Sequence, residues 1–378
     1  MAICMSWIYC GCQTVNSHSV PAQILLDRVL SGEALLGARA AQLALPEEDI
    51  FKITPEMHDF LRAHIPETLT DYYKLQELIK AVTDKSQLGW EYDAFKTCNA
   101  ADTFHLRKGN CISYAIMMVA LGRELGLDLY FNEVYIPPTW DLQTEFTVVL
   151  FRHVNVLAKV DVRHMVLGLN MEEYDSSFPQ HLISDVEAEA HYHNNRGTDY
   201  LNADNIEQAF LHFQKALILQ PDKAFIWGNL GVLYLRYGHY QEAEAAFLHA
   251  LELNSSEITA ISNLQRLYVK QSNTRLASYY KKEAERSRLK NPYYRYYLAE
   301  KFLDDNHPDL ALKNIKWAIG RYRKEHRFHF LAAKIYARLG RQDDAEKSLE
   351  QAAFLTENEN SRLLYDSKIA RLREISGK

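Results

Sequence analysis

Residues 224–254 read AFIWGNLGVLYLRYGHYQEAEAAFLHALELN, and this stretch decides the fold of the second half of the chain. It places small residues at Ala243 and Ala250, and bulky residues at Tyr234 and Phe247. Small residues allow two helices to cross closely, and large apolar residues fill the space where one helix pair stacks on the next. The stretch therefore predicts a helical hairpin.

The same pattern recurs every 34 residues through the C-terminal half. Small residues occupy two positions of each unit: Ala209, Ala243, Ala277, Ala311 and Ala345, and then Ala216, Ala250, Ala284, Ala318 and Ala352. Two further positions are aromatic or bulky: Tyr200, Tyr234, Tyr268, Phe302 and Tyr336, and then Phe213, Phe247, Ile315 and Leu349, with Lys281 breaking the second series. Units in register at a fixed period predict an all-α solenoid.

Residues 190–359 resemble five tetratricopeptide (TPR) repeats, because Pro221 and Trp227 also fall where that pattern has Pro and Trp. A capping helix is expected over 360–378. The resemblance implies a concave groove, lined by the first helix of each repeat, that holds a protein or peptide segment.

The two halves of the chain differ in charge. Residues 190–378 carry 29 basic and 23 acidic residues, whereas the preceding residues carry 14 and 26. The net charge of -6 argues against a chain that coats nucleic acid with its whole surface, and a protein or peptide is the expected partner. The basic runs KKEAERSRLK (281–290) and RYRKEHR (321–327), with tyrosines between them, are typical of a surface that binds an acidic peptide or a nucleic acid. The alternative is that the charges are solvated helix ends and the tyrosines pack between repeats.

The N-terminal half contains a candidate thiol site. Gly109 and Asn110 indicate a helix start, and Cys111 opens an apolar helix that ends near Gly126. A thiol in the first helical turn is expected to have a lowered pKa. Strands follow, and one of them carries His153. A cysteine with a histidine is the arrangement of thiol acyl transfer, in which imidazole accepts the thiol proton.

This region resembles the transglutaminase-like superfamily, which has a papain-like fold. The matching motifs are RKGNC (107–111), GRELGL (122–127) and HVNV (153–156). The resemblance implies that Cys111 is the nucleophile and His153 the general base.

The resemblance also implies an Asp about fifteen residues after the histidine, where this chain has Gly168. Asn170 is the candidate for orienting His153, as Asn does in papain-like triads, and Asp161 and Asp175 fit less well. Activity is therefore expected to be reduced, specialised or absent.

The sequence thus predicts an α+β transglutaminase-like domain over 21–185, followed by the all-α TPR solenoid. Within that domain, a helical lobe is expected over 21–96, and the cysteine helix and sheet over 97–178. The expected function is thiol-dependent acyl transfer or amide hydrolysis on a protein or peptide recruited by the repeats. The alternative is a catalytically impaired pseudoenzyme that acts as a TPR interaction scaffold. Hydrolysis and cross-linking stay open.

Residues 1–20 are predicted to be a leader or a disordered N-terminus. Gly11-Cys12 resembles the end of a bacterial lipoprotein signal, which would place the protein in the periplasm or on a membrane; otherwise a cytoplasmic location is expected. No apolar run reaches the roughly 18 residues of a membrane span. No motif indicates a nucleotide or another cofactor, and we expect no metal site.

Overall fold

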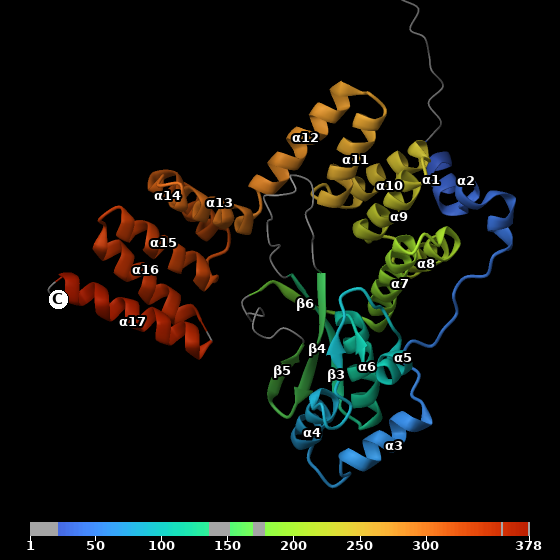
Figure 1. Cartoon of the computed structure of the whole chain (residues 1–378), viewed down its shortest axis with the longest axis horizontal. Helices are drawn as coiled ribbons and strands as arrows, with labels where there is room; N and C mark the ends of the chain where they lie inside the picture. The colour runs from blue at the N-terminus through green and yellow to red at the C-terminus, as the bar shows by residue number, and fades with distance from the viewer. Residues whose placement is uncertain (1–21, 136–151, 169–177, 357, 377–378) are drawn as a thin grey trace, which may run out of the picture.

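The computed structural model describes residues 22–135, 152–168, 178–356 and 358–376 of the chain. A sheet with flanking helices forms in the first half, and paired helices form the second half (Figure 1). The predicted leader 1–20, with Cys12, and the candidate Asn170 lie outside the described residues.

The sheet has the strand order β5-β4-β3-β6, and every neighbouring pair is antiparallel. Its strands are β3 (Asp128–Tyr135), β4 (Arg152–Val160), β5 (Arg163–Leu167) and β6 (Gln180–Ile183). Alternate residues of β4 (Val154, Val156 and Ala158) are buried in one core with helix α6 (Cys111–Glu124). Because side chains alternate along a strand, one face of the sheet packs on α6.

Helix α6 is buried from Ile112 to Gly122 and forms the centre of this core. Around it lie α3 (Pro55–His64), α4 (Asp71–Thr83) and α5 (Ala100–Leu106). A short parallel ladder joins β1 (Glu91–Tyr92) to β2 (Lys108–Gly109) directly before α6. The core therefore fixes Cys111 at the first turn of a rigid helix.

The second half consists of helix pairs, and the predicted all-helical solenoid is confirmed. The pairs are α7 (Asp185–Asn202) with α8 (Ile206–Leu219), α9 (Ala224–Arg236) with α10 (Tyr240–Leu253), α11 (Ile258–Lys270) with α12 (Thr274–Leu289), α13 (Pro292–Asp304) with α14 (Pro308–Arg321), and α15 (His326–Arg338) with α16 (Gln342–Leu355). A last helix, α17 (Glu359–Ser376), packs on α16.

Glycines in the first two pairs allow the close helix contacts that the pattern predicts. A Cβ atom on Gly197 would lie 2.7 Å from Cδ1 of Phe213, and one on Gly231 would lie 2.6 Å from Cε1 of Phe247. Both phenylalanine rings are fully buried. Each ring therefore occupies the volume that a larger residue on the facing helix would need.

The N-terminal helices α1 (Ala22–Ser31) and α2 (Glu33–Leu36), with the 3-10 turn η1 (Gly37–Gln42), pack on the repeats. Val29 and Leu36 belong to the repeat core, and the hydroxyl of Tyr234 donates a hydrogen bond of 2.6 Å to the Val29 carbonyl. The predicted lobe 21–96 is therefore not one unit. Its apolar helices are divided between two cores, and α3 and α4 support α6.

The repeat array meets the sheet a second time at its fourth helix pair (Figure 1). Tyr135, at the end of β3, packs against the core of this pair, and its hydroxyl oxygen accepts a hydrogen bond of 3.0 Å from Asn291. The ring of Phe178 lies edge-on to Tyr293 with 6.4 Å between centroids. The array thus arches over one end of the sheet.

Replacement of Gly231 by Ala is expected to lower the free energy of unfolding of the repeats by about 1–3 kcal/mol, because the new methyl group overlaps the Phe247 ring. Gly320→Ala is the matched control, since nothing lies within 4 Å of its Cβ position in α14. That control should raise stability by up to about 1 kcal/mol through helix propensity. Urea unfolding followed by circular dichroism measures both changes, and equal effects at the two sites would contradict the packing argument.

Candidate functional site

A cavity of about 460 Å³ lies between the start of α6 and the first helices of the repeats. Cys111 and Val154 line it from the α+β side, and His191, Asn229 and Thr259 line it from α7, α9 and α11. The candidate nucleophile and the concave face of the repeat array therefore share one cavity.

Side-chain caps hold the backbone around Cys111. Asn110 caps α6 by accepting a hydrogen bond of 3.1 Å from the Ser113 N–H, and its amide donates one of 2.9 Å to the Thr97 hydroxyl. The Ser113 hydroxyl oxygen also accepts from the Cys98 N–H at 2.8 Å. The Gly-Asn-Cys pattern therefore forms the helix start that the sequence predicts.

Burial raises the pKa of the Cys111 thiol, and this effect exceeds the opposing influence of nearby backbone N–H groups, of which the N–H of Val154 comes first. The expectation of a lowered pKa was wrong. Loss of solvation destabilises the thiolate more than the helix N-terminus stabilises it. The contact with Val154 nevertheless places the sulfur against the strand that carries His153.

His153 pairs in register with Val134. By alternation its side chain belongs to the face of the sheet opposite α6, the face that also carries Asn155. Gly168 follows β5 on that face, since its Cβ position lies 3.1 Å from the Asn155 Cβ. The sequence position implied for an Asp thus provides no carboxylate there. The triad Cys111, His153 and Asn170 stays a prediction.

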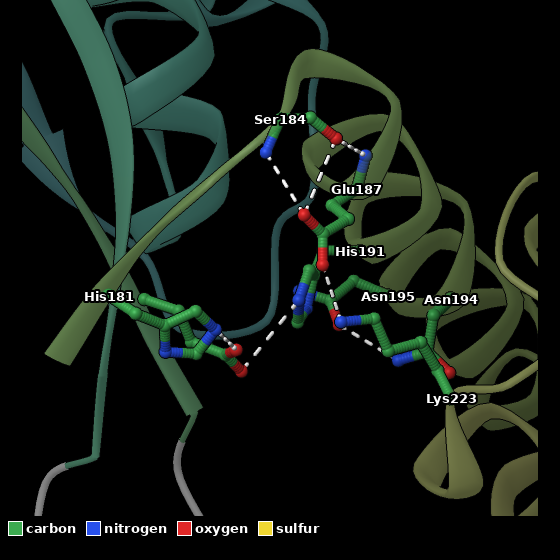
Figure 2. A network of polar contacts seen from close by, with 8 residues as sticks. His181, Ser184, Glu187, His191, Asn194, Asn195 and Lys223 are labelled. Carbon is green, nitrogen blue, oxygen red and sulfur yellow. Dashed lines mark hydrogen bonds and ion pairs between the residues drawn. The ribbon is translucent and has the colours of Figure 1, made fainter. Parts of the chain in front are cut away.

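A buried carboxylate links the sheet to the first repeat helix. Glu133 on β3 is 7 % exposed, and its oxygens lie 3.4 Å from Nε2 of His181 and 3.7 Å from Nε2 of His191. His191 also stacks on Phe225 at 5.0 Å between centroids. Figure 2 shows His191 between the sheet and the pair formed by Glu187 and Lys223. The sequence analysis missed this group, because no pattern links β3 with α7.

Asparagines follow the repeat period on the first helices. Asn195, Asn229 and Asn263 are spaced by 34 residues, and the first two line the cavity. The amide of Asn229 donates a hydrogen bond of 2.8 Å to Asn194. We call Asn195, Asn229 and Asn263 the asparagine series. The sequence analysis missed it, although the repeat period contained the signal.

The rim of the cavity is aromatic, and its interior carries an acidic group. Phe95 is 87 % exposed and Tyr92 is 47 % exposed, although both line the cavity. Deeper inside, Asp199 accepts a hydrogen bond of 3.1 Å from the Thr97 N–H, and burial raises the pKa of its carboxyl group. The cavity therefore offers apolar surface at its mouth and polar groups within.

A second cavity of about 520 Å³ adjoins the first, and Glu257 lines both. It contains three basic residues: Arg288, Lys290 and Arg321. The tyrosines between the basic runs pack in the core, since Tyr293 is buried and Tyr296 stacks on Phe328. Part of the predicted basic surface thus faces a cavity, whereas these tyrosines serve packing.

Comparison with protein families shows TPR repeats in this chain. Family models described as tetratricopeptide repeat match residues 224–256 and 296–360, together about a quarter of the chain. The family models support the repeat half of the predicted architecture.

Curated relatives match short segments. A protein O-mannosyl-transferase of Caenorhabditis elegans is 34 % identical over 85 residues, which is 22 % of this chain and 12 % of that protein. Superkiller protein 3 of Schizosaccharomyces pombe is 38 % identical over 66 residues, which is 18 % of this chain and 5 % of that protein. The chain thus spans about an eighth or less of the length of these relatives.

Solved structures match about half of the chain. YrrB, described as a TPR protein with an unusual peptide-binding site, is 20 % identical, covers 48 % of this chain and 94 % of its own, and gives a TM-score of 0.25. PilF of Pseudomonas aeruginosa is 19 % identical, covers 50 % of this chain and 87 % of its own, and gives a TM-score of 0.27.

No helix in the described part of the chain is long and apolar enough to cross a membrane. Over those same residues, no group of three or more His, Cys, Asp and Glu side chains is placed to hold a metal ion.

Two buried histidines behind the site predict sensitivity to acid. The Nδ1 atoms of His193 and His212 lie 2.9 Å apart between α7 and α8, and burial lowers the two pKa values to about 3 and about 4. Since the unfolded value is about 6.5, the unfolded chain binds more protons below that pH. The free energy of unfolding should therefore be highest above about pH 6.5 and fall towards pH 4, by up to about 1.4 kcal/mol per pH unit for each histidine.

The double variant His193→Gln/His212→Gln should flatten this pH dependence. His164→Gln, at an exposed position of β5, is the control and should leave the slope unchanged. Urea unfolding measured at several pH values gives the slopes. The buried pair would not be the cause if the double variant kept the wild-type slope.

Proposed function

We propose that this protein is an interaction scaffold that binds an extended peptide segment along the first helices of its TPR repeats. The asparagine series carries this proposal, because Asn195 and Asn229 line a cavity on the concave face of the array. TPR repeats as a class offer a concave surface to a protein or peptide partner.

Asparagine suits this role chemically. Its side-chain amide donates through nitrogen and accepts through oxygen, which are the two functions that a peptide backbone requires. Amides repeated along the groove would therefore bind main chain with little dependence on ligand sequence. Phe95 and Tyr92 at the rim add exposed aromatic surface for an apolar ligand side chain.

We propose further that the ligand is acidic at the end that reaches the second cavity. Arg288, Lys290 and Arg321 converge there, and the array as a whole carries a basic surplus. Charge complementarity of this kind raises association rates and fixes the direction of the ligand.

Alanine replacement of Asn195 and Asn229 together should weaken peptide binding at least about tenfold, since each lost hydrogen bond costs about 0.5–1.5 kcal/mol and leaves a ligand group unpaired. Peptides selected from a random display library on the full chain serve as ligands, with affinity measured by fluorescence anisotropy. Gln241→Ala, at an exposed position of α10, is the control. Selected peptides that bind the double variant and wild type equally would contradict the proposed groove.

Charge-reversal variants distinguish the contribution of the basic cavity to peptide affinity from that of the rest of the basic surface. Lys290→Glu with Arg321→Glu should lower the affinity for acidic peptides at least about tenfold and reduce its dependence on salt. Lys281→Glu with Lys282→Glu is the matched control, because both lysines are exposed on α12 outside the cavity lining. Equal losses of affinity in the two double variants would show that the overall positive charge attracts the peptide and would contradict a defined subsite.

A second candidate function is thiol-dependent acyl transfer or amide hydrolysis by a transglutaminase-like domain. We propose α3 to β6 as this domain, with Cys111 as nucleophile and His153 and Asn170 as the partners implied by resemblance. The observation in its favour is that Cys111 opens into the same cavity as the asparagine series. The raised pKa of its thiol and the glycine at position 168 favour the scaffold as the main role.

A further inference from the structure

We propose that His191, on the first helix of the repeat array, is the proton acceptor of Cys111, and that Glu133 holds its imidazole ring in place. The thiol site would then be built from both halves of the chain. This inference goes beyond peptide binding and does not depend on it.

The strand register brings these groups together. The sulfur of Cys111 lies at the backbone N–H of Val154, and Val154 is the direct cross-strand partner of Glu133. Facing residues of neighbouring antiparallel strands are about 4.5–5.5 Å apart. Glu133 in turn pairs with His191, which lines the same cavity as Cys111. Cys111 on α6 and His191 on α7 thus line one cavity on the α6 face of the sheet, and each of them contacts one member of the cross-strand pair Val154 and Glu133.

Glu133 supplies the carboxylate that position 168 does not. A histidine that accepts a proton in a buried site needs an acceptor to orient its ring and to stabilise the imidazolium. On the face of His153, the implied Asp position is Gly168, and a side chain there would press on Asn155. On the α6 face, the Glu133 carboxylate lies 3.7 Å from His191. The chain thus has no carboxylate at position 168, but it has Glu133 beside a different histidine, His191.

Other charged groups surround the pair. His181 approaches Glu133 from β6, and Glu187 pairs with Lys223 close to His191 in Figure 2. Tyr92, Asp199 and Glu257 face the cavity from its walls. Stacking on Phe225 fixes the ring plane of His191, so the ring is held by the sheet on one side and by α9 on the other.

Burial makes a nearby base favourable for reaction of this thiol at neutral pH. Because burial raises the pKa of Cys111, a standing thiolate is disfavoured at neutral pH. The proton must then leave as the sulfur attacks, which requires an acceptor within reach of the sulfur.

The proposed reaction is a thiol-mediated hydrolysis of an amide. His191 takes the proton from Sγ of Cys111 while sulfur bonds to the carbonyl carbon of an amide. The carbon–nitrogen bond breaks, and the amine leaves with the proton that His191 returns. Water then hydrolyses the thioester, which gives a carboxylic acid and restores the thiol.

The test is the rate of Cys111 alkylation by iodoacetamide in the full chain, measured between mildly acidic and alkaline pH. Peptide mass mapping assigns the label to Cys111 and distinguishes it from Cys98 and the N-terminal cysteines. Wild type should show an inflection in the histidine range in addition to that of the thiol. His191→Gln should remove this inflection and slow alkylation at neutral pH at least about tenfold. His164→Gln, at an exposed strand position, should stay within about twofold of wild type.

Imidazole rescue separates a chemical role from a structural one. Added imidazole should restore alkylation in His191→Ala if the ring acts as a base, and Glu133→Gln should shift the inflection to lower pH by removing the stabilising charge. Loss of the inflection in His153→Gln, with His191→Gln unchanged, would overturn the proposal in favour of the strand histidine. An ordinary thiol profile in wild type would overturn it as well. Peptide affinity is measured separately, so failure here leaves the scaffold role untouched.

Discussion

Helix α7 is shared between two hydrophobic cores, and the arrangement of the whole protein depends on this sharing. Ala188 and Tyr192 pack with the core of α6 and the sheet, whereas Ala190 and Leu201 pack with the repeats. A helix that is apolar on more than one side must be covered on each of them. The first repeat is therefore also a wall of the α+β half, and α7 fixes where the array begins against the sheet.

This shared helix has consequences for the groove. The array begins beside α6 and meets the sheet again at Tyr135, so its concave side faces the end of the sheet. Two adjoining cavities fill this space, one beside Cys111 and one lined by basic residues. A ligand that follows the first helices would pass from the basic cavity towards the thiol. A cavity of different lining chemistry thus lies near each of the two contacts between the array and the sheet.

The repeat half of the fold could be predicted from the sequence, because equivalent side chains make equivalent contacts in each repeat. The alanine positions and Phe213 and Phe247 are buried as their spacing predicts. The helix start at Asn110 was readable for a similar reason, since capping is a local interaction. Features that depend on contacts between segments far apart in the chain could not be predicted from the sequence. The packing of Val29 against Tyr234 and the pairing of Glu133 with His191 join segments that no local pattern connects.

The surroundings of Cys111, and not its motif alone, decide the state of its thiol. The Gly-Asn-Cys motif correctly predicts a helix start, and a helix terminus does favour a thiolate. In this fold, however, Cys111 is half-buried between α6, β4 and α7, and desolvation raises the pKa of its thiol more than the nearby backbone N–H groups lower it. The reactivity of this thiol therefore depends on the groups that share its cavity. Here those groups come from the repeat helices as much as from the sheet, so a reaction of Cys111 and a ligand held by the repeats would share one cavity.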